Sequence, residues 1–191
     1  ELSDEPTIIA AGPLCSDSLY EAISKRVGTN RMSFFDAAAP IVSYESIDHS
    51  IVFSQSRYED LGIGDYLNCP MNKEEYDTFV DELLAAKRVI GHDFEQSDLF
   101  QACQPIEEVA RTGHDSIRFG ALKPVGLIDP RTGKRPWAAV QLRAENAAKT
   151  AFNLVGFQTN LVWGEQRRVF SMIPGLGEAE FLRYGVMHRN S

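Results

Sequence analysis

Cys103 is the residue whose position most favours chemistry, because it lies two residues before Pro105, a residue type typical of the first turn of a helix. Free backbone N–H groups at a helix start, together with the positive end of the helix dipole, stabilise a thiolate over a thiol. A thiolate could add to C6 of a uracil ring, or could exchange redox equivalents near a flavin. Spacing alone leaves the alternative open, and even favours it: a small buried packing group.

The remaining cysteines and the histidines are weaker candidates. Cys15 also lies close to a predicted helix start, and Cys69 lies within a loop-rich stretch. His114 and His188 could act as acids or bases, although structural or surface roles are commoner for a histidine. The three cysteines are widely spaced, with no C-x-x-C and no nearby His pair. The sequence therefore predicts neither a disulfide framework nor a metal site, and a reducing compartment fits best.

A basic and aromatic cluster is the second candidate site. Arg131, Lys134 and Arg135 precede Trp137, a combination typical of nucleic-acid contacts. The chain has a net charge of -8, but residues 1–110 hold 7 Lys or Arg against 21 Asp or Glu, whereas residues 111–191 hold 12 against 6. Such segregation permits a basic face on an acidic protein. Solvated acidic helices and a solvated hairpin tip are the competing interpretations.

The elements that must position these residues form a mixture without strict alternation, which predicts an α/β protein of mixed α+β type. A buried strand is predicted over residues 7–11 and another over 32–35, while a hairpin with one solvent-exposed face is predicted from 137–143 and 152–158. Residues 43–71 are loop-rich and unassigned. Caps and apolar stripes predict helices over 17–27, 72–88, 105–113, 161–173 and 178–184.

Two absences limit the function classes. No G-x-G-x-x-G and no phosphate-binding loop occurs, so the main fingerprint for a flavin or nicotinamide must lie outside these residues. No run approaches the roughly 18 apolar residues that a membrane span needs, and residues 1–6 are acidic, unlike the basic and apolar start of a signal peptide. We expect a cytoplasmic protein without a membrane partner. The absence of an initial Met, followed at once by an apolar strand, predicts a segment of a larger enzyme.

Many short motifs resemble, in the same order, those of the bacterial folate- and FAD-dependent tRNA (uracil-5-)-methyltransferases, which are related to the glucose-inhibited division protein A flavoproteins. They include Lys-Pro-Val-Gly-Leu at 123–127 and Cys-Gln-Pro-Ile-Glu at 103–107. The others extend the resemblance over nearly the whole chain: residues 11–17, 34–42, 56–58, 65–71, 118–120, 140–143, 153–159, 173–176, 179–181 and 183–190.

The resemblance implies an enzyme that takes a one-carbon unit from methylenetetrahydrofolate and makes 5-methyluridine in the T-loop of tRNA. Reduced FAD would serve as carrier and hydride source, and NAD(P)H would reduce the flavin. Cys103 matches one of the family's two functional cysteines, although Gln101, Ala102 and Gln104 depart from the family motif around it, and Cys15 replaces the usual Thr. The predicted site residues are Cys103 and Glu107 for catalysis, Gly12 and Pro13 for the cofactor, and Arg118, Lys123, Arg131, Lys134 and Arg135 for tRNA.

The resemblance also implies the domain organisation. Residues 1–30 would be a strand-turn-helix piece of the FAD-binding fold, 31–175 an α+β domain inserted into that two-dinucleotide-binding-type flavoprotein, and 176–191 the return toward it. The partners would be tRNA and the remaining FAD-binding domain of the same protein, without which this segment would bind FAD poorly. Two alternatives remain: a tRNA-docking module without chemistry, and a related flavin-dependent wobble-uridine modifier or oxidoreductase.

Overall fold

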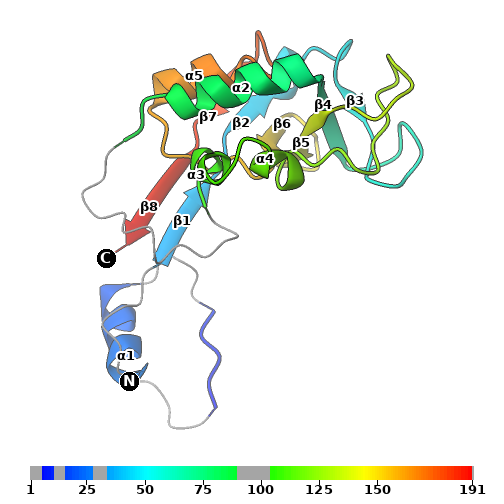
Figure 1. Ribbon diagram of the computed structural model, residues 1–191. Helices are drawn as coiled ribbons and strands as arrows, with labels where there is room; N and C mark the ends of the chain where they lie inside the picture. The colour runs from blue at the N-terminus through cyan, green and yellow to red at the C-terminus, as the bar shows by residue number, and fades with distance from the viewer. Residues whose placement is uncertain (1–5, 11–15, 28–33, 90–103, 191) are drawn as a thin grey trace.

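A six-stranded antiparallel sheet organises the chain in the computed structural model, which describes residues 6–10, 16–27, 34–89 and 104–190. Figure 1 shows the sheet beneath a layer of helices. All of its pairings are antiparallel. Strands from the two halves of the sequence lie next to one another, as β4 and β5 do. The strand order is β3 (Phe53–Ser54), β4 (Tyr66–Met71), β5 (Ala138–Ala144), β6 (Ala151–Leu154), β2 (Ile41–Ser43) and β7 (Phe181–Arg183).

Helix α2 (Lys73–Ala85) is the main cover of the sheet, and it begins where the sequence predicts. Its N-cap is Asn72, whose side chain accepts a hydrogen bond from the Glu75 backbone while the Glu75 carboxylate accepts one from the Asn72 N–H. The spacing i, i+3, i+4, i+7 turns one face inward. That face is buried through Tyr76, Phe79, Val80 and Leu83.

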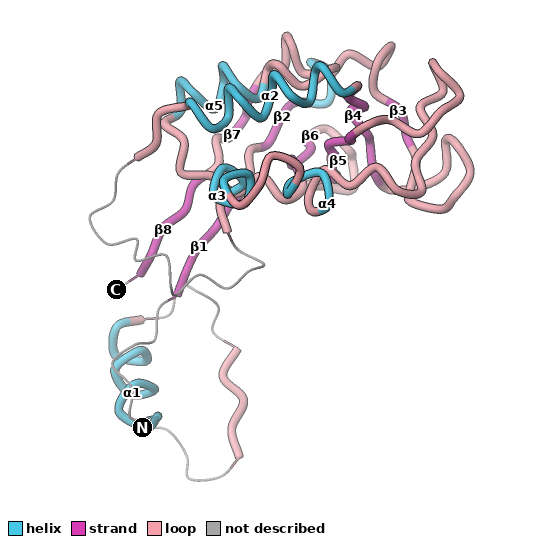
Figure 2. Tube along the Cα trace, viewed as in Figure 1, coloured by secondary structure: helices cyan, strands magenta, loops and turns pink. Residues whose placement is uncertain are grey.

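Helices α5 (Trp163–Phe170) and α3 (Ile106–Arg111) lie on the two sides of α2 (Figure 2). Both contact α2, and α3 is followed by α4 (Ser116–Phe119). Aromatic rings join these layers: the centroid of Phe157 lies 6.2 Å from that of Phe79 in α2 and 5.3 Å from that of Phe170 in α5. Each fully buried ring of this kind contributes about 1.5–3 kcal/mol. A short 3-10 helix, η1 (Tyr44–Ser46), follows β2.

The predicted hairpin is confirmed as β5 and β6, but its solvent-exposed face is not. Residues 138–142 are all buried, because helices cover one face of β5 and residue Leu127 packs with Ala139 and Phe53 on the other. Strand β4, in the segment left unassigned, pairs with β5 over its whole length. Pro70 is tolerated there because β3 reaches only Leu67 and Asn68, so the other side of Pro70 needs no ladder hydrogen bond.

Two terminal predictions are wrong. Residues 6–10 form no strand in the described part of the chain and are exposed, with Ile8 at 95%. Residues 178–184 contain strand β7 rather than a helix, because pairing with β2 overrides local propensity. The predicted helix over 17–27 is confirmed as α1 (Asp17–Val27), where the Ser16 hydroxyl accepts from the Leu19 N–H.

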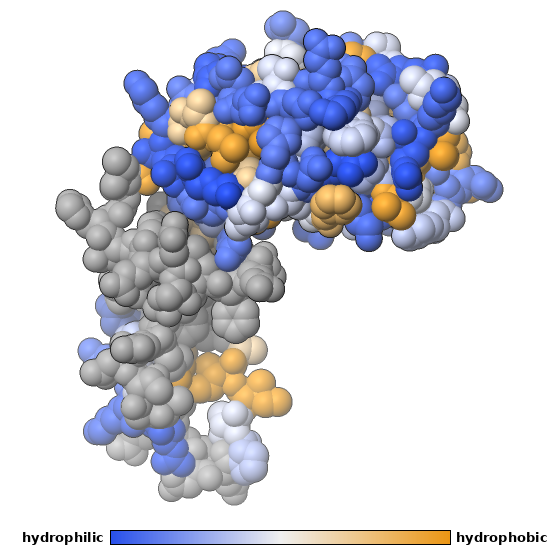
Figure 3. All heavy atoms as spheres, viewed as in Figure 1, coloured by the Kyte–Doolittle hydropathy of each residue, from blue (hydrophilic) through white to orange (hydrophobic). Residues whose placement is uncertain are grey.

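A separate two-stranded ribbon joins the sheet unit to the segment that carries α1. Strand β1 (Phe34–Ala38) pairs antiparallel with β8 (Val186–Asn190), from Phe34 opposite Asn190 to Ala38 opposite Val186. Figure 1 shows α1 beyond the end of this ribbon, apart from the sheet. Figure 3 shows mainly hydrophilic residues on the visible face of the sheet unit, interrupted by separate hydrophobic patches. Within the described residues, no helix is both long and apolar enough to cross a membrane.

Candidate nucleic-acid interface

A cleft of ≈ 690 Å³ gathers most of the predicted basic residues. It lies between the end of β4, the first turn of α2, helix α4 and the loop that leads into β5. Four of the five predicted tRNA contacts line it, together with a lysine that the sequence analysis did not select. These residues are Arg118, Arg131, Lys134, Arg135 and Lys73, around Trp137.

In the turn before β5, the buried Asp129 holds the guanidinium of Arg131 in place. Asp129 is 3% exposed. Its carboxylate accepts hydrogen bonds from the Arg131 backbone N–H at 2.9 Å, from Nε at 3.2 Å and from Nη2 at 2.9 Å. The turn closes where the Asp129 N–H donates to the Lys134 carbonyl, and Gly133 supplies the positive φ of 66° that it needs. The hydrogen bond with Asp129 raises the pKa of Arg131, so its guanidinium is held both charged and oriented.

Arg118 is fixed against Trp137 at the other side of the cleft. Its Nε donates to the Trp137 carbonyl at 2.8 Å, and its Cζ lies 3.8 Å from the centroid of the indole ring. Lys73 Nζ lies 5.7 Å from the same centroid. Two cations therefore lie against one aromatic ring, an arrangement worth about 0.5–2 kcal/mol for each contact.

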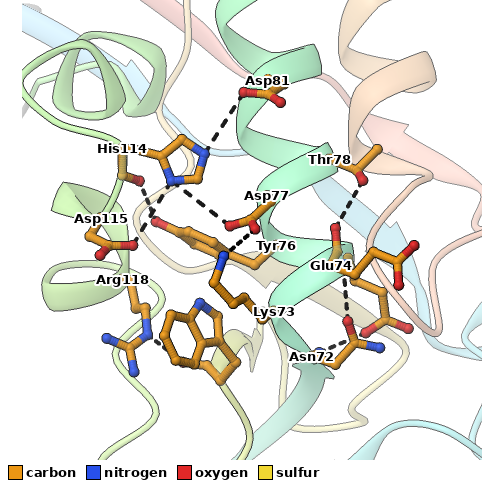
Figure 4. A network of polar contacts seen from close by, with 12 residues as sticks. Asn72, Lys73, Glu74, Tyr76, Asp77, Thr78, Asp81, His114, Asp115 and Arg118 are labelled. Carbon is orange, nitrogen blue, oxygen red and sulfur yellow. Dashed lines mark hydrogen bonds and ion pairs between the residues drawn. The ribbon is translucent and has the colours of Figure 1, made fainter.

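The contacts between α2 and the α3–α4 turn position Arg118 (Figure 4). The Tyr76 hydroxyl donates to the His114 carbonyl at 2.7 Å, and burial raises the pKa of this tyrosine. The His114 ring lies 3.9 Å from Asp77 and from Asp115 and 3.8 Å from Asp81. Figure 4 shows the imidazole directed toward carboxylates of α2, so this histidine links the turn to α2. Its use as an acid or base stays a prediction.

Lys123, the fifth predicted tRNA contact, does not line the cleft. Its carbonyl and that of Val125 accept hydrogen bonds from the Arg57 guanidinium, while the Lys123 residue itself is exposed. The family motif at 123–127 therefore lies at a bend held by Arg57, and burial lowers the pKa of that guanidinium.

The predicted catalytic residues lie at and before α3. Cys103, like Gly12, Pro13 and Cys15, lies outside the described residues. Glu107, in the first turn of α3, has no exposed surface. Its carboxylate accepts from the Thr159 hydroxyl at 2.8 Å and from the Asn160 N–H at 2.7 Å. Burial raises the pKa of Glu107, and these contacts tie the start of α3 to the loop before α5.

Cys69 is excluded as a thiolate by its surroundings. It lies in β4 opposite Val140, has no exposed surface, and burial strongly raises the pKa of its thiol. It is an apolar packing group in the core.

Two residues of the cleft were missed by reasoning from the sequence. Lys73 follows the N-cap of α2, but only the unassigned strand β4 brings that helix start to Trp137. Asp129 could have been found from the sequence. In an Asx-turn the Asp side chain accepts a hydrogen bond from the backbone N–H two residues later, here that of Arg131.

The structure defines a class of domain: an antiparallel sheet covered by helices, with a basic cleft at the start of its main helix. The chain matches the family model described as glucose inhibited division protein A over residues 2–191. It therefore belongs to the glucose inhibited division protein A family.

Its curated relatives include methylenetetrahydrofolate--tRNA-(uracil-5-)-methyltransferases named TrmFO. The protein of Desulforudis audaxviator is 58% identical over 189 residues, which cover 98% of this chain and 42% of that protein. The protein of Moorella thermoacetica is 56% identical over 186 residues, 97% of this chain and 42% of the relative. The protein of Lactobacillus helveticus is 58% identical over 188 residues, 98% of this chain and 46% of the relative. The chain thus spans less than half the length of these relatives.

Solved structures of Aquifex aeolicus GidA share the fold. The form II and form I crystal structures each superpose with a TM-score of 0.52 at 12% identity, covering 88% of this chain. The matched regions make up 26% of the form II chain and 28% of the form I chain. The likeness supports the predicted mixed α/β fold class.

Proposed function

We propose that this chain is the tRNA-contacting segment of a tRNA (uracil-5-)-methyltransferase, which binds the tRNA backbone through the basic cleft. The observation that carries the proposal is the convergence of Arg118, Arg131, Lys134 and Arg135 on one cleft. The names of the relatives, which match 97–98% of the chain, supply the substrate class and the reaction. The product would be 5-methyluridine in the T-loop.

The charges of the cleft favour a phosphate ligand. Its two acids are already engaged: Asp129 binds Arg131, and Glu75 caps α2 through the Asn72 N–H. In the described part of the chain no ion pair joins Lys134 or Arg135 to an acid, and both residues are exposed. Phosphate oxygens accept from guanidinium and ammonium groups in the same way as these carboxylates do. An RNA backbone that enters the cleft would find unpaired cations at its rim.

The rest of the proposed reaction rests on the family. Methylenetetrahydrofolate and FAD would be the cofactors, NAD(P)H the reductant, and the remaining FAD-binding domain the partner in a cytoplasmic enzyme. Cys103 and Glu107 remain the proposed catalytic residues, and Gly12 and Pro13 the proposed FAD contacts. The buried contacts of Glu107 would also hold the start of the helix that Cys103 precedes. We also retain Lys123 as a proposed tRNA contact outside the cleft.

The experiment measures tRNA affinity of the purified protein at several salt concentrations. Lys134→Ala and Arg135→Ala each should weaken binding and lower the slope of log K against log salt by about 0.7–0.9, the value for one lost phosphate contact. Lys25→Ala is the matched control, because Lys25 is an exposed cation at the end of α1 and should leave the slope unchanged. Unchanged affinity in both cleft variants would refute the proposed interface.

The reaction is tested separately in cells. Mass spectrometry of T-loop nucleosides should show that a deletion strain lacks 5-methyluridine and that the wild-type gene restores it. Cys103→Ala should bind tRNA but restore no product. Restored 5-methyluridine with Cys103→Ala would remove that thiol from the mechanism while leaving the binding proposal intact.

A further inference from the structure

Three aromatic rings form a ladder at the edge of the sheet that is farthest from β3. Tyr184 is stacked between two neighbours: its ring centroid lies 5.6 Å from that of Phe181 at an interplanar angle of 12°, and 5.9 Å from that of Trp163 at 15°. Phe181 belongs to the edge strand β7, and Trp163 begins α5. The ladder therefore joins two elements that the basic cleft does not use.

The last ring of the ladder has an open face. Trp163 is 65% exposed although one side of its indole faces Tyr184. Large exposure of a tryptophan is costly in water, because its ring is among the largest apolar groups in a protein. A partner that covers this face would continue the same nearly parallel stack.

Three exposed cations belong to segments next to the exposed ring. Arg167 lies one turn after Trp163 on α5, so the two side chains share a helix face. Lys87 is adjacent through its carbonyl, which accepts from the Val162 N–H, and Arg183 precedes Tyr184. All three cations are exposed, and none has an ion pair within the described residues.

Acidic side chains do not cancel this charge. Glu165 is the acid of the first turn of α5, but Arg168 binds its carboxylate through Nε at 3.0 Å and Nη2 at 2.7 Å. Glu82 of α2 binds the same arginine. The residues named around Trp163 therefore hold four cations against two acids, so this surface is positive as well as aromatic.

We propose that Trp163 is a stacking platform for an unstacked base of RNA, with Arg167, Lys87 and Arg183 contacting the neighbouring phosphates. A nucleobase fits both features, because it is planar and is linked to negative charges on each side, whereas an apolar protein partner would leave the three cations unpaired. Gln166 fixes the platform: its Nε2 donates to the Leu161 and Gly185 carbonyls at 2.8 Å, and its Oε1 accepts from the Gly185 N–H at 2.7 Å. The choice of RNA rests on the proposed function.

The test is the affinity of the purified protein for a fluorescein-labelled oligouridylate of about 12 nucleotides, measured by anisotropy; the length lies within the site sizes of single-strand binders. Trp163→Ala should weaken binding about 5- to 150-fold, the range for one base stacked on an aromatic ring. Trp163→Phe retains a ring and should stay within about threefold of wild type. Arg167→Ala should lower the salt slope by about 0.7, as expected for one contact to a single strand.

The matched control is Leu182→Ala. Leu182 is 53% exposed on the same edge strand but alternates with Phe181, so it faces away from that ring and its loss should not alter affinity. Unchanged binding by Trp163→Ala overturns the inference, and so does an equal loss in Leu182→Ala. A change in the oligomeric state of Trp163→Ala without a change in RNA affinity also overturns it, since a protein would then cover the ring.

The two proposals fail separately. If Trp163→Ala binds normally while Arg135→Ala binds tRNA weakly, the ladder is wrong and the cleft stands. The reverse result removes the cleft and keeps the ladder.

Discussion

Replacing Glu107 tests how a buried carboxylate holds the start of α3. Glu107→Ala removes the acceptor for the Thr159 hydroxyl and for the Asn160 N–H. A buried donor without a partner costs about 1–3 kcal/mol. Thr159 is 1% exposed, so it bears the full cost, whereas Asn160 is only half-buried and water can reach it. Removal of the carboxylate also removes its burial penalty. We expect a net loss of about 1–3 kcal/mol in the free energy of unfolding.

Glu107→Gln is the matched variant, because it keeps the shape of the side chain without the charge. Its amide oxygen can accept from the Asn160 N–H while its NH₂ donates to the Thr159 hydroxyl oxygen, which already accepts from the Leu161 N–H. The loss should therefore be about 1 kcal/mol near pH 5.

The pH dependence follows from the raised pKa of Glu107. The folded protein keeps Glu107 protonated at pH values above 4.5, the ordinary pKa of a glutamate. The contribution of this protonation to stability is therefore complete below pH 4.5 and is lost as pH rises through the folded pKa. Wild type should lose its advantage over Glu107→Gln as the pH rises above 4.5 and passes through the folded pKa. Urea unfolding at several pH values measures this difference. A constant difference, or a loss below about 1 kcal/mol in Glu107→Ala, would refute the reasoning.

Two further predictions concern α2 and β4. Asn72→Ala should lower the free energy of unfolding by about 1 kcal/mol, because it removes the side-chain acceptor of the capping box, whereas Asn72→Asp should preserve the cap; thermal unfolding of both variants decides this. Cys69 should resist iodoacetamide in the native protein and react after denaturation, since burial raises the pKa of its thiol; peptide mapping by mass spectrometry that finds native Cys69 alkylated would contradict the buried placement.

Locally coded elements were predictable from the sequence. The starts of α1, α2 and α3 follow from Ser16, Asn72 and Pro105, because caps act within one turn of chain. Strand β7 was not predictable in this way, since residues 181–183 acquire their conformation from pairing with β2, which lies far earlier in the sequence. Strand β4 contains a proline and a cysteine and depends on β5 in the same way.

The same division applies to the candidate site. Arg131, Lys134 and Arg135 lie within one turn, so their proximity to Trp137 follows from the sequence. The position of Arg118 over the indole depends on the α3–α4 turn, and that of Lys73 on β4. The burial of Glu107 was also unpredictable, because its partners lie 52 and 53 residues later in the chain.

The pairing of β1 with β8 has a mechanical consequence for whatever the sheet unit is attached to. The chain enters and leaves this unit through neighbouring strands that run in opposite directions. A double-stranded stalk resists twisting more than one extended linker does, because its ladder hydrogen bonds must break before the strands can rotate independently. The sheet unit would therefore move as one rigid body relative to the domain to which it is attached, because both connections to that domain lie side by side.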